Sequence, residues 1–278
     1  MRPLFTGPLS VESVQVPIAG LAPSLQGTTV VQLSDFHYDG ERLSDRLLNR
    51  AIAAIPRLNP DLVVFTGDFI TSDPTPIIPL AAALEPIART YPTYAVLGNH
   101  DLYWSNARSM VTHQLRQAGV QVLWNQIAYP LGQTLALVGL ADQTHQEYST
   151  AVLDQLDASI PRIVLSHNPD TAADMRRYRV DLQLSGHTHG GQLVLPGLGN
   201  IVQLWDYLRR PIPEAWRRGI PYLSEECFKV VEHWEWAMGL HQIGHNLLYV
   251  SRGLGSYAPG RLFCNPEITA ITLKTAEI

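Results

Sequence analysis

The chain has 278 residues, of which 46% are hydrophobic, and this is enough apolar material to bury one large core. Its formal net charge is −5, and no run of Lys or Arg reaches five residues. This argues against a nucleic-acid groove, whose affinity depends on neutralising phosphates. Cys227 and Cys264 lie far apart, so we expect neither a disulfide framework nor a thiolate zinc site, and a reducing, cytoplasmic setting fits.

The first 25 residues carry Pro or Gly every few positions and contain no uninterrupted apolar stretch. They predict neither a signal peptide nor a helix that spans a bilayer. No other apolar run approaches the roughly 18 residues that a membrane span needs. We therefore expect a cytoplasmic protein, with peripheral contact to the inner membrane surface as an open alternative.

Five short aliphatic and β-branched runs predict strands of a sheet that is covered on both faces. The stretches 41–58 and 105–119 separate some of them and have helical spacing, the second opening on a capping Ser105 and stopping at Gly119. Strands that alternate with helices predict a largely parallel or mixed α/β sheet. The five runs are TTVVQLS (28–34), DLVVFTG (61–67), TYAVLG (93–98), RIVLS (162–166) and VDLQLSG (180–186).

Four further runs predict additional strands, at 121–126, 134–142, 246–251 and 267–274. Residues 203–244 differ in character, because they contain four of the six tryptophans. We interpret this segment as an inserted cap within a single domain that spans residues 1–278. The predicted fold is therefore of the α/β class, with a Trp-rich inserted cap.

Each of the five strands is followed by side chains of the kind that bind metal ions. The carboxyl ends of strands form the functional crevice of open α/β sheets, so these side chains are expected to converge. Residues at i and i+2 of an extended backbone point to the same side, which pairs residue 35 with 37 and residue 187 with 189. The side chains are Asp35, His37, Asp68, Asn99, His100, Asp101, His167, His187 and His189.

Seven of these nine residues, all except His100 and Asp101, are counted as metal ligands. A single tetrahedral metal needs three or four ligands, so seven mixed nitrogen and oxygen donors suit two ions that share a carboxylate. Asp68 is the natural bridge, because it lies between the two groups in the order of strands. Such donor sets favour Mn²⁺, Fe or Zn²⁺ over Mg²⁺ or Ca²⁺.

The motifs SDFH, TGD, GNHD, SH and GHTH, in this order over residues 34–189, resemble those of the calcineurin-like metallophosphoesterase superfamily. The resemblance implies a four-layer, mixed-sheet α/β sandwich and a metal-dependent hydrolase of phosphoric esters or anhydrides. It implies that His100 is the catalytic histidine, and we add Asp101 as a residue that could orient it. The implied ligands of one metal are Asp35, His37, Asp68 and His189, and those of the other are Asp68, Asn99, His167 and His187.

The later motifs, GHTHGGQLVLPGLG, YVSRGLG and RLFCNPEITAITL, are similar to a subgroup of membrane-associated phosphoesterases. One activity of that subgroup is cleavage of the pyrophosphate in UDP-2,3-diacylglucosamine. The resemblance implies a small phosphoester substrate with a lipid or nucleotide part. The tryptophans of residues 203–244 suit the core of the cap or, as the alternative, a platform for peripheral membrane contact. Arg252 and Arg261 are expected to form salt bridges rather than to contact the substrate.

The expected reaction is attack on phosphorus by a hydroxide that bridges two ions, with His100 protonating the leaving oxygen. A phosphodiesterase or nuclease of the same superfamily is one alternative, although the acidic net charge weighs against nucleic acid. A scaffold that has lost catalysis is another, and it would be expected to lack His100 or several ligands. The sequence predicts no oligomeric state.

Overall fold

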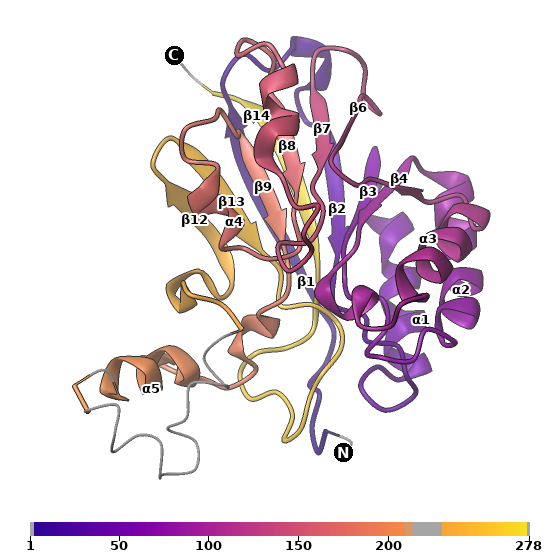
Figure 1. Cartoon of the computed structure of the whole chain (residues 1–278), viewed down its shortest axis with the longest axis vertical. Helices are drawn as coiled ribbons and strands as arrows, with labels where there is room; N and C mark the ends of the chain where they lie inside the picture. The colour runs from indigo at the N-terminus through magenta and orange to yellow at the C-terminus, as the bar shows by residue number, and fades with distance from the viewer. Residues whose placement is uncertain (1–2, 210, 213–229, 277–278) are drawn as a thin grey trace.

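The computed structural model describes residues 3–209, 211–212 and 230–276 (Figure 1). Two six-stranded sheets stack face to face, and helices cover their outer faces (Figure 1). This is the mixed-sheet α/β sandwich that the sequence predicts, and the layers run helix, sheet, sheet, helix.

The first sheet has the order β1-β14-β2-β3-β4-β5. β14 pairs antiparallel with β2 and parallel with β1, and β2 to β5 are parallel to one another. The sequence pattern did not predict β1, because its alternating polar residues lie in the Pro- and Gly-rich opening. The bounds are β1 Ser10–Ile18, β2 Thr29–Leu33, β3 Leu62–Thr66, β4 Thr93–Val96, β5 Gln121–Val122 and β14 Glu267–Thr275.

The second sheet has the order β12-β13-β9-β8-β7-β6. Its four central strands are parallel, and β12 and β6 pair antiparallel at the two edges. The bounds are β6 Gln126–Ala128, β7 Ala136–Gly139, β8 Arg162–Leu165, β9 Leu182–Ser185, β12 Gly239–Ile243 and β13 Asn246–Val250. A separate two-stranded ladder joins β10 (Val194–Leu195) to β11 (Gly199–Asn200).

Apolar side chains between the two sheets form the central core, with Val64 and Val96 from the first sheet and Leu165 and Leu184 from the second. This packing brings the ends of strands from both sheets to one edge of the sandwich. A second core lies between the first sheet and the helices α1 (Asp45–Ala54), α2 (Ile77–Thr90) and α3 (Ala107–Gln117). On the outer face of the second sheet pack the short helices η4 (Thr150–Gln155) and α4 (Thr171–Asp174).

The helix boundaries follow local capping chemistry. The hydroxyl of Ser44 accepts a hydrogen bond from Leu47 N, which fixes the start of α1. α3 starts after Asn106 rather than at the expected cap Ser105, and it ends at Gln117, two residues before Gly119, whose φ of 97° turns the chain away from the helix. The remaining short 3-10 helices are η1 Pro23–Leu25, η2 Ile55–Leu58, η3 Asn99–Leu102, η5 His189–Gly191 and η7 Trp234–Trp236.

Part of the tryptophan-rich segment 203–244 is built into the second sheet. Residues 239–243 of the segment form the edge strand β12, so this part belongs to the second sheet. The helix α5 (Ile201–Arg209) projects from the body of the molecule (Figure 1). Trp236 is buried against β12 and β13, whereas Trp234 is buried in a small cluster that includes Val202 of α5. Residues 210 and 213–229, on which much of the expected cap falls, lie outside the described residues.

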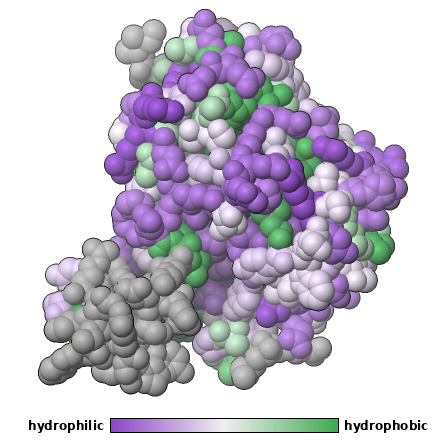
Figure 2. All heavy atoms as spheres, in the orientation of Figure 1, coloured by the Kyte–Doolittle hydropathy of each residue, from purple (hydrophilic) through white to green (hydrophobic). Residues whose placement is uncertain are grey.

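Within the described residues, no helix is both long and apolar enough to cross a bilayer. The face of the molecule seen in Figure 2 is largely hydrophilic, with smaller apolar patches.

Candidate active site

The strands β2, β3 and β4 of the first sheet and β8 and β9 of the second end at the same edge of the sandwich, and the predicted site residues follow them. The amide of Gln32 connects the two sheets there, because its Nε2 donates to Ser185 O at 2.9 Å and to Thr66 Oγ1 at 2.9 Å. These hydrogen bonds join the two sheets at the edge where the predicted site residues lie.

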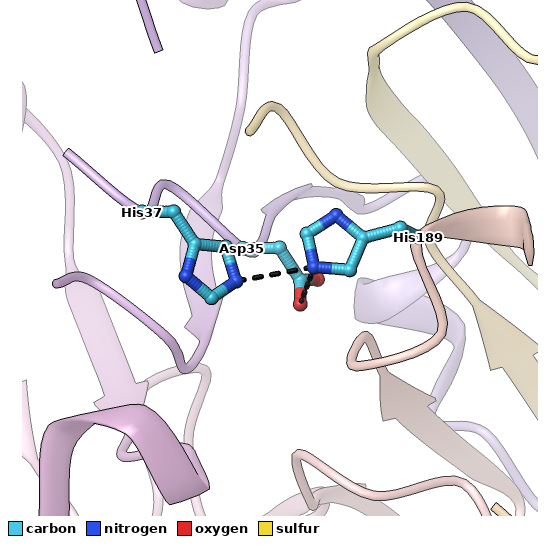
Figure 3. Close-up of side chains that lie close together, drawn as sticks. All are labelled: Asp35, His37 and His189. Carbon is cyan, nitrogen blue, oxygen red and sulfur yellow. Dashed lines mark hydrogen bonds and ion pairs between the residues drawn. The ribbon is translucent and has the colours of Figure 1, made fainter. Parts of the chain in front are cut away.

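Asp35, His37 and His189 form a first compact group of ligand-type side chains (Figure 3). Nε2 of His37 lies 3.1 Å from Nε2 of His189, and Nε2 of His189 lies 3.6 Å from Oδ1 of Asp35. All three residues are buried. Two ring nitrogens and a carboxylate oxygen that converge in this way could hold one cation.

Asp68, His167 and His187 form a second group. Nε2 of His167 lies 3.1 Å from Oδ2 of Asp68 and 3.1 Å from Nδ1 of His187. The same Oδ2 atom lies 3.3 Å from Nε2 of His37, a member of the first group. Asp68 therefore stands between the two groups, as expected for a bridging carboxylate.

The backbone is strained at most of these positions. A positive φ is uncommon for any residue with a side chain, and such strain clusters at functional sites. Asp68 also needs a neighbour without a side chain, because a Cβ on Gly98 would lie 2.2 Å from its Oδ1. The residues with positive φ are Asp35 (52°), His37 (41°), Asp68 (55°), His187 (72°) and His189 (52°).

Backbone carbonyls fix which ring nitrogen of three histidines carries the proton. A carbonyl only accepts hydrogen bonds, so the nitrogen that faces it is the donor, and the other nitrogen presents a lone pair. In each case this second nitrogen is the one that faces the neighbouring ligand groups, as metal-binding histidines require. The donors are His167 Nδ1 to Thr66 O (2.6 Å), His189 Nδ1 to Gly255 O (3.1 Å) and His187 Nε2 to Val230 O (2.8 Å).

The hydrogen bonds of Asn99 indicate whether the site suits a cation. Its Nδ2 donates to the Tyr103 hydroxyl at 2.8 Å, whereas its buried Oδ1 has no hydrogen-bond partner. A buried oxygen without a donor costs free energy unless something satisfies it. A divalent cation would do so, and the set of imidazole, carboxylate and amide donors fits Mn²⁺, Fe or Zn²⁺.

The electrostatics of Asp68 and His189 favour cation binding, whereas a cation at His167 would have to displace a proton, because burial is outweighed by Asp68, which raises the pKa of His167 to about 10. Burial opposes charge on Asp68, but the nearby His167 and His100 hold the pKa of its carboxyl well below the usual range. Burial, together with the neighbouring His37 and Arg261, holds the pKa of His189 well below its usual value. An ionised carboxylate and a neutral imidazole are the protonation states in which these side chains bind metals.

His100 and Asp101 occupy different environments. Nδ1 of His100 lies 2.5 Å from the Thr71 carbonyl oxygen, and its Nε2 lies 3.4 Å from the Tyr257 hydroxyl. The Asp101 carboxylate accepts instead from four backbone N–H groups. The group in contact with the His100 ring is therefore the Thr71 carbonyl rather than the expected Asp101, which instead binds backbone N–H groups around Asp68. The four donors are Gly98 N (2.9 Å), Asp68 N (3.0 Å), Phe69 N (2.9 Å) and Ile70 N (3.2 Å).

A cavity of about 900 Å³ opens directly in front of these groups. Its lining includes other polar and acidic residues, among them Asn168, Asp174 and Glu232, and the predicted site residues Asp68, Asn99, His100, His187 and His189. No described residue that lines it is Lys or Arg. Among the described lining residues, none therefore brings a cationic side chain to an anionic substrate.

Comparison with known proteins decides the family. The calcineurin-like phosphoesterase family matches residues 28–191, which include all nine predicted site residues. The chain belongs to this family. As a calcineurin-like phosphoesterase, it is a hydrolase of phosphoesters, as the sequence motifs imply.

Curated relatives of this phosphoesterase extend beyond the matched region. It is 33% identical to phosphodiesterase YaeI of Escherichia coli over 249 residues, covering 88% of this chain and 81% of the relative. It is 31% identical to the uncharacterized metallophosphoesterase YkuE of Bacillus subtilis, covering 98% of this chain and 88% of that protein. It is 28% identical to the UDP-2,3-diacylglucosamine pyrophosphatase LpxG of Chlamydia trachomatis, covering 88% of this chain and 83% of LpxG.

Arg252 and Arg261, the two arginines of the later motifs, bond to other groups of the protein. Arg252 pairs with Glu12 and Glu267, as expected for a salt bridge. Arg261 differs from expectation, because its buried guanidinium donates to backbone carbonyls, including Gly255 O at 2.6 Å and His189 O at 3.3 Å. Neither arginine lines the cavity.

The sequence motifs did not identify Thr71, Tyr103 or Tyr257 as members of the site. Thr71 acts through its main-chain oxygen, which no sequence pattern encodes. Tyr103 follows the GNHD motif by two residues, and Tyr257 follows Gly255 in the loop after β13, beyond the matched region. Each contacts His100 or Asn99, and only folding brings Thr71 and Tyr257 to that position.

Proposed function

We propose that this phosphoesterase is a dinuclear enzyme. The proposal rests chiefly on the position of Asp68 Oδ2 within 3.3 Å of His37 Nε2 and 3.1 Å of His167 Nε2. Two bound divalent cations supply activation of the attacking water and neutralisation of phosphoryl charge. Asp35, His37, Asp68 and His189 would hold one cation, and Asp68, Asn99, His167 and His187 the other.

His100 is proposed to protonate the oxygen of the leaving group. Its Nε2 faces the cavity, while the hydrogen bond from Nδ1 to the Thr71 carbonyl fixes the ring. General acid catalysis by a positioned side chain contributes about 10²–10⁴-fold. The donor set makes Mn²⁺ the proposed native metal, with Fe or Zn²⁺ as the alternatives.

The proposed substrate is a small phosphodiester or pyrophosphate with a lipid or nucleotide part. The name of the relative LpxG makes UDP-2,3-diacylglucosamine one candidate, and the name of YaeI supports a phosphodiester. The cavity has room for a nucleotide-sized group. The lack of Lys and Arg among its described lining residues weighs against a polyanion such as nucleic acid.

A substrate panel tests this proposal. The protein is loaded with Mn²⁺, Fe²⁺ or Zn²⁺ and assayed on bis(4-nitrophenyl) phosphate, phosphomonoesters, nucleotides, UDP-2,3-diacylglucosamine and DNA. We expect metal-dependent hydrolysis of the small diester or pyrophosphate, and none of DNA. Cleavage of DNA with Mn²⁺ would favour the nuclease alternative, and failure on every substrate with every metal would favour the scaffold.

We also propose peripheral contact with the cytoplasmic surface of a membrane through the 203–244 segment. The support is the exposure of apolar side chains on α5, with Trp205 40%, Tyr207 73% and Leu208 50% exposed. Amphipathic helices use such side chains to enter the headgroup region. Cosedimentation with liposomes is expected for the wild type and not for a variant with Ser at these three positions. Equal cosedimentation of both proteins would contradict the proposal.

A further inference from the structure

Tyr257 occupies a position in the site that neither the motifs nor the proposed ligand sets explain. It lies in the loop that follows β13 and lines the cavity. Its hydroxyl oxygen lies 3.1 Å from Nδ1 of His37 and 3.4 Å from Nε2 of His100. One hydroxyl therefore contacts both a proposed metal ligand and the proposed general acid.

Three separate contacts hold Tyr257 in place. Its backbone N donates to Oε1 of Gln192 at 2.6 Å. The guanidinium of Arg42 lies over its ring, 4.7 Å from the centroid, at a distance typical of a cation–π contact. The third contact is that of the hydroxyl with the two imidazoles, so the side chain has little freedom to leave the site.

The contacts of Tyr257 continue through Arg42 and Asp39 to Thr71, on the other side of His100. Arg42 forms an ion pair with Asp39, and Asp39 accepts a hydrogen bond from Oγ1 of Thr71 at 2.9 Å. The carbonyl of Thr71 in turn binds Nδ1 of His100. His100 is thus held on one nitrogen by Thr71 and approached on the other by Tyr257, and both of these residues are linked to Asp39.

The direction of the hydrogen bonds follows from the acceptors. Since the Thr71 carbonyl can only accept, Nδ1 of His100 carries a proton and its Nε2 faces Tyr257. In the proposed ligand set Nε2 of His37, which faces Asp68 and His189, would bind a cation, and Nδ1 of His37 would then carry the proton and donate to the Tyr257 oxygen. A hydroxyl can donate and accept at once, so it can serve His37 and either protonation state of His100.

We propose that Tyr257 is a positioning residue of the hydrolytic reaction: His37 anchors its hydroxyl, and the hydroxyl sets the orientation of His100 toward the leaving group. This inference rests on the proposed function of His100. It adds a residue from outside the region that matches the family, and it gives the loop after β13 a part in the reaction.

The variant Tyr257→Phe tests the proposal, because it removes the hydroxyl and keeps the ring beneath Arg42. We expect kcat for an alkyl phosphodiester to fall by about threefold to tenfold, the usual effect of one lost hydrogen bond. KM and metal content should stay as in the wild type. The loss should be smaller for bis(4-nitrophenyl) phosphate, whose leaving group needs no proton. A merely structural role would lower both rates equally.

A double-mutant cycle with His100→Ala separates action through His100 from a general effect. If Tyr257 acts by positioning His100, Tyr257→Phe causes no further loss in the His100→Ala background. Tyr249→Phe is the matched control, since it removes a buried hydroxyl, bonded to Glu267 at 3.0 Å, that does not line the cavity. This control should keep the wild-type dependence on the leaving group.

The possible results distinguish this inference from the proposed function. If the metal-loaded wild type hydrolyses no phosphoester, the proposed function fails. If the wild type is active and Tyr257→Phe retains its full kcat on the alkyl substrate, only the role of Tyr257 is overturned. A loss that multiplies with that of His100→Ala would also overturn it.

Discussion

Asp68 and His167 belong to different sheets, yet Oδ2 of Asp68 lies 3.1 Å from Nε2 of His167. The contact exists only because the two sheets pack with their strand ends at one edge. The stacking of the sheets therefore assembles the site, and each sheet alone carries only part of it.

Replacement of Asp68 is expected to abolish the reaction. Asp68→Ala removes the carboxylate between the two histidine groups, so both metal occupancy and nearly all activity should be lost. Metal analysis and turnover measure this. Asp61→Ala is the control, because Asp61 precedes the same strand β3 at its other end and bonds Thr29 N. An Asp68→Ala protein with half the wild-type turnover and its metals bound would refute the two-ion mechanism.

Replacement of His100 should separate metal binding from proton transfer. His100→Ala is expected to keep its metals and to lose about 10²–10⁴-fold in kcat on an alkyl ester, with a smaller loss on a nitrophenyl ester. The rates on both esters and the metal content are compared with His113→Ala on α3. Equal losses on the two esters would mean that His100 does not protonate the leaving group.

A methyl group at Gly98 is expected to disturb Asp68 directly. A Cβ there would lie 2.2 Å from Oδ1 and 2.7 Å from the backbone N of Asp68, so the loop must move. Gly98→Ala should therefore lose metal affinity and activity. Gly132→Ala is the control, since Gly132 has a φ of 93° but open space around its Cβ position. If Gly98→Ala bound Mn²⁺ as tightly as Gly132→Ala, the close approach would have no functional meaning.

Asp101→Ala should affect stability more than His100→Ala does. Four backbone N–H groups lose their acceptor, and we expect the free energy of unfolding to fall by about 2–4 kcal/mol. Denaturant unfolding in the presence of chelator measures this without a contribution from bound metal. Equal stability of the two variants would show that the Asp101 contacts do not secure the loop.

The part of the site that follows strand ends could be predicted from the sequence. Each motif ends a short apolar run with Ser or Gly and then a ligand. Parallel strands bring such ends to one edge of a sheet. The position of each motif after a strand is therefore enough to predict that Asp35, Asp68 and His187 lie in one site. The buried strand runs likewise predict a largely parallel or mixed sheet, and the resemblance to the family supplies its division into a four-layer sandwich.

Other features of the fold and the site depend on long-range packing, so no local pattern in the sequence predicts them. β1 alternates polar and apolar residues in a Pro-rich opening, and α2 contains Pro86, which disfavours a helix in the absence of tertiary contacts. Tyr257 reaches His100 across 157 positions of sequence, through a loop that contains no His, Asp or Glu. The Thr71 carbonyl is a backbone group, and its partner depends on the fold alone.

The metal content of the protein at saturation tests the central claim most directly. Purified chain is equilibrated with excess Mn²⁺, freed of loosely bound ions and analysed for manganese per polypeptide, with Asp68→Ala treated in parallel. The account predicts two tightly held ions in the wild type and neither in the variant. One ion or none per wild-type chain, under conditions that support full hydrolysis, would contradict it.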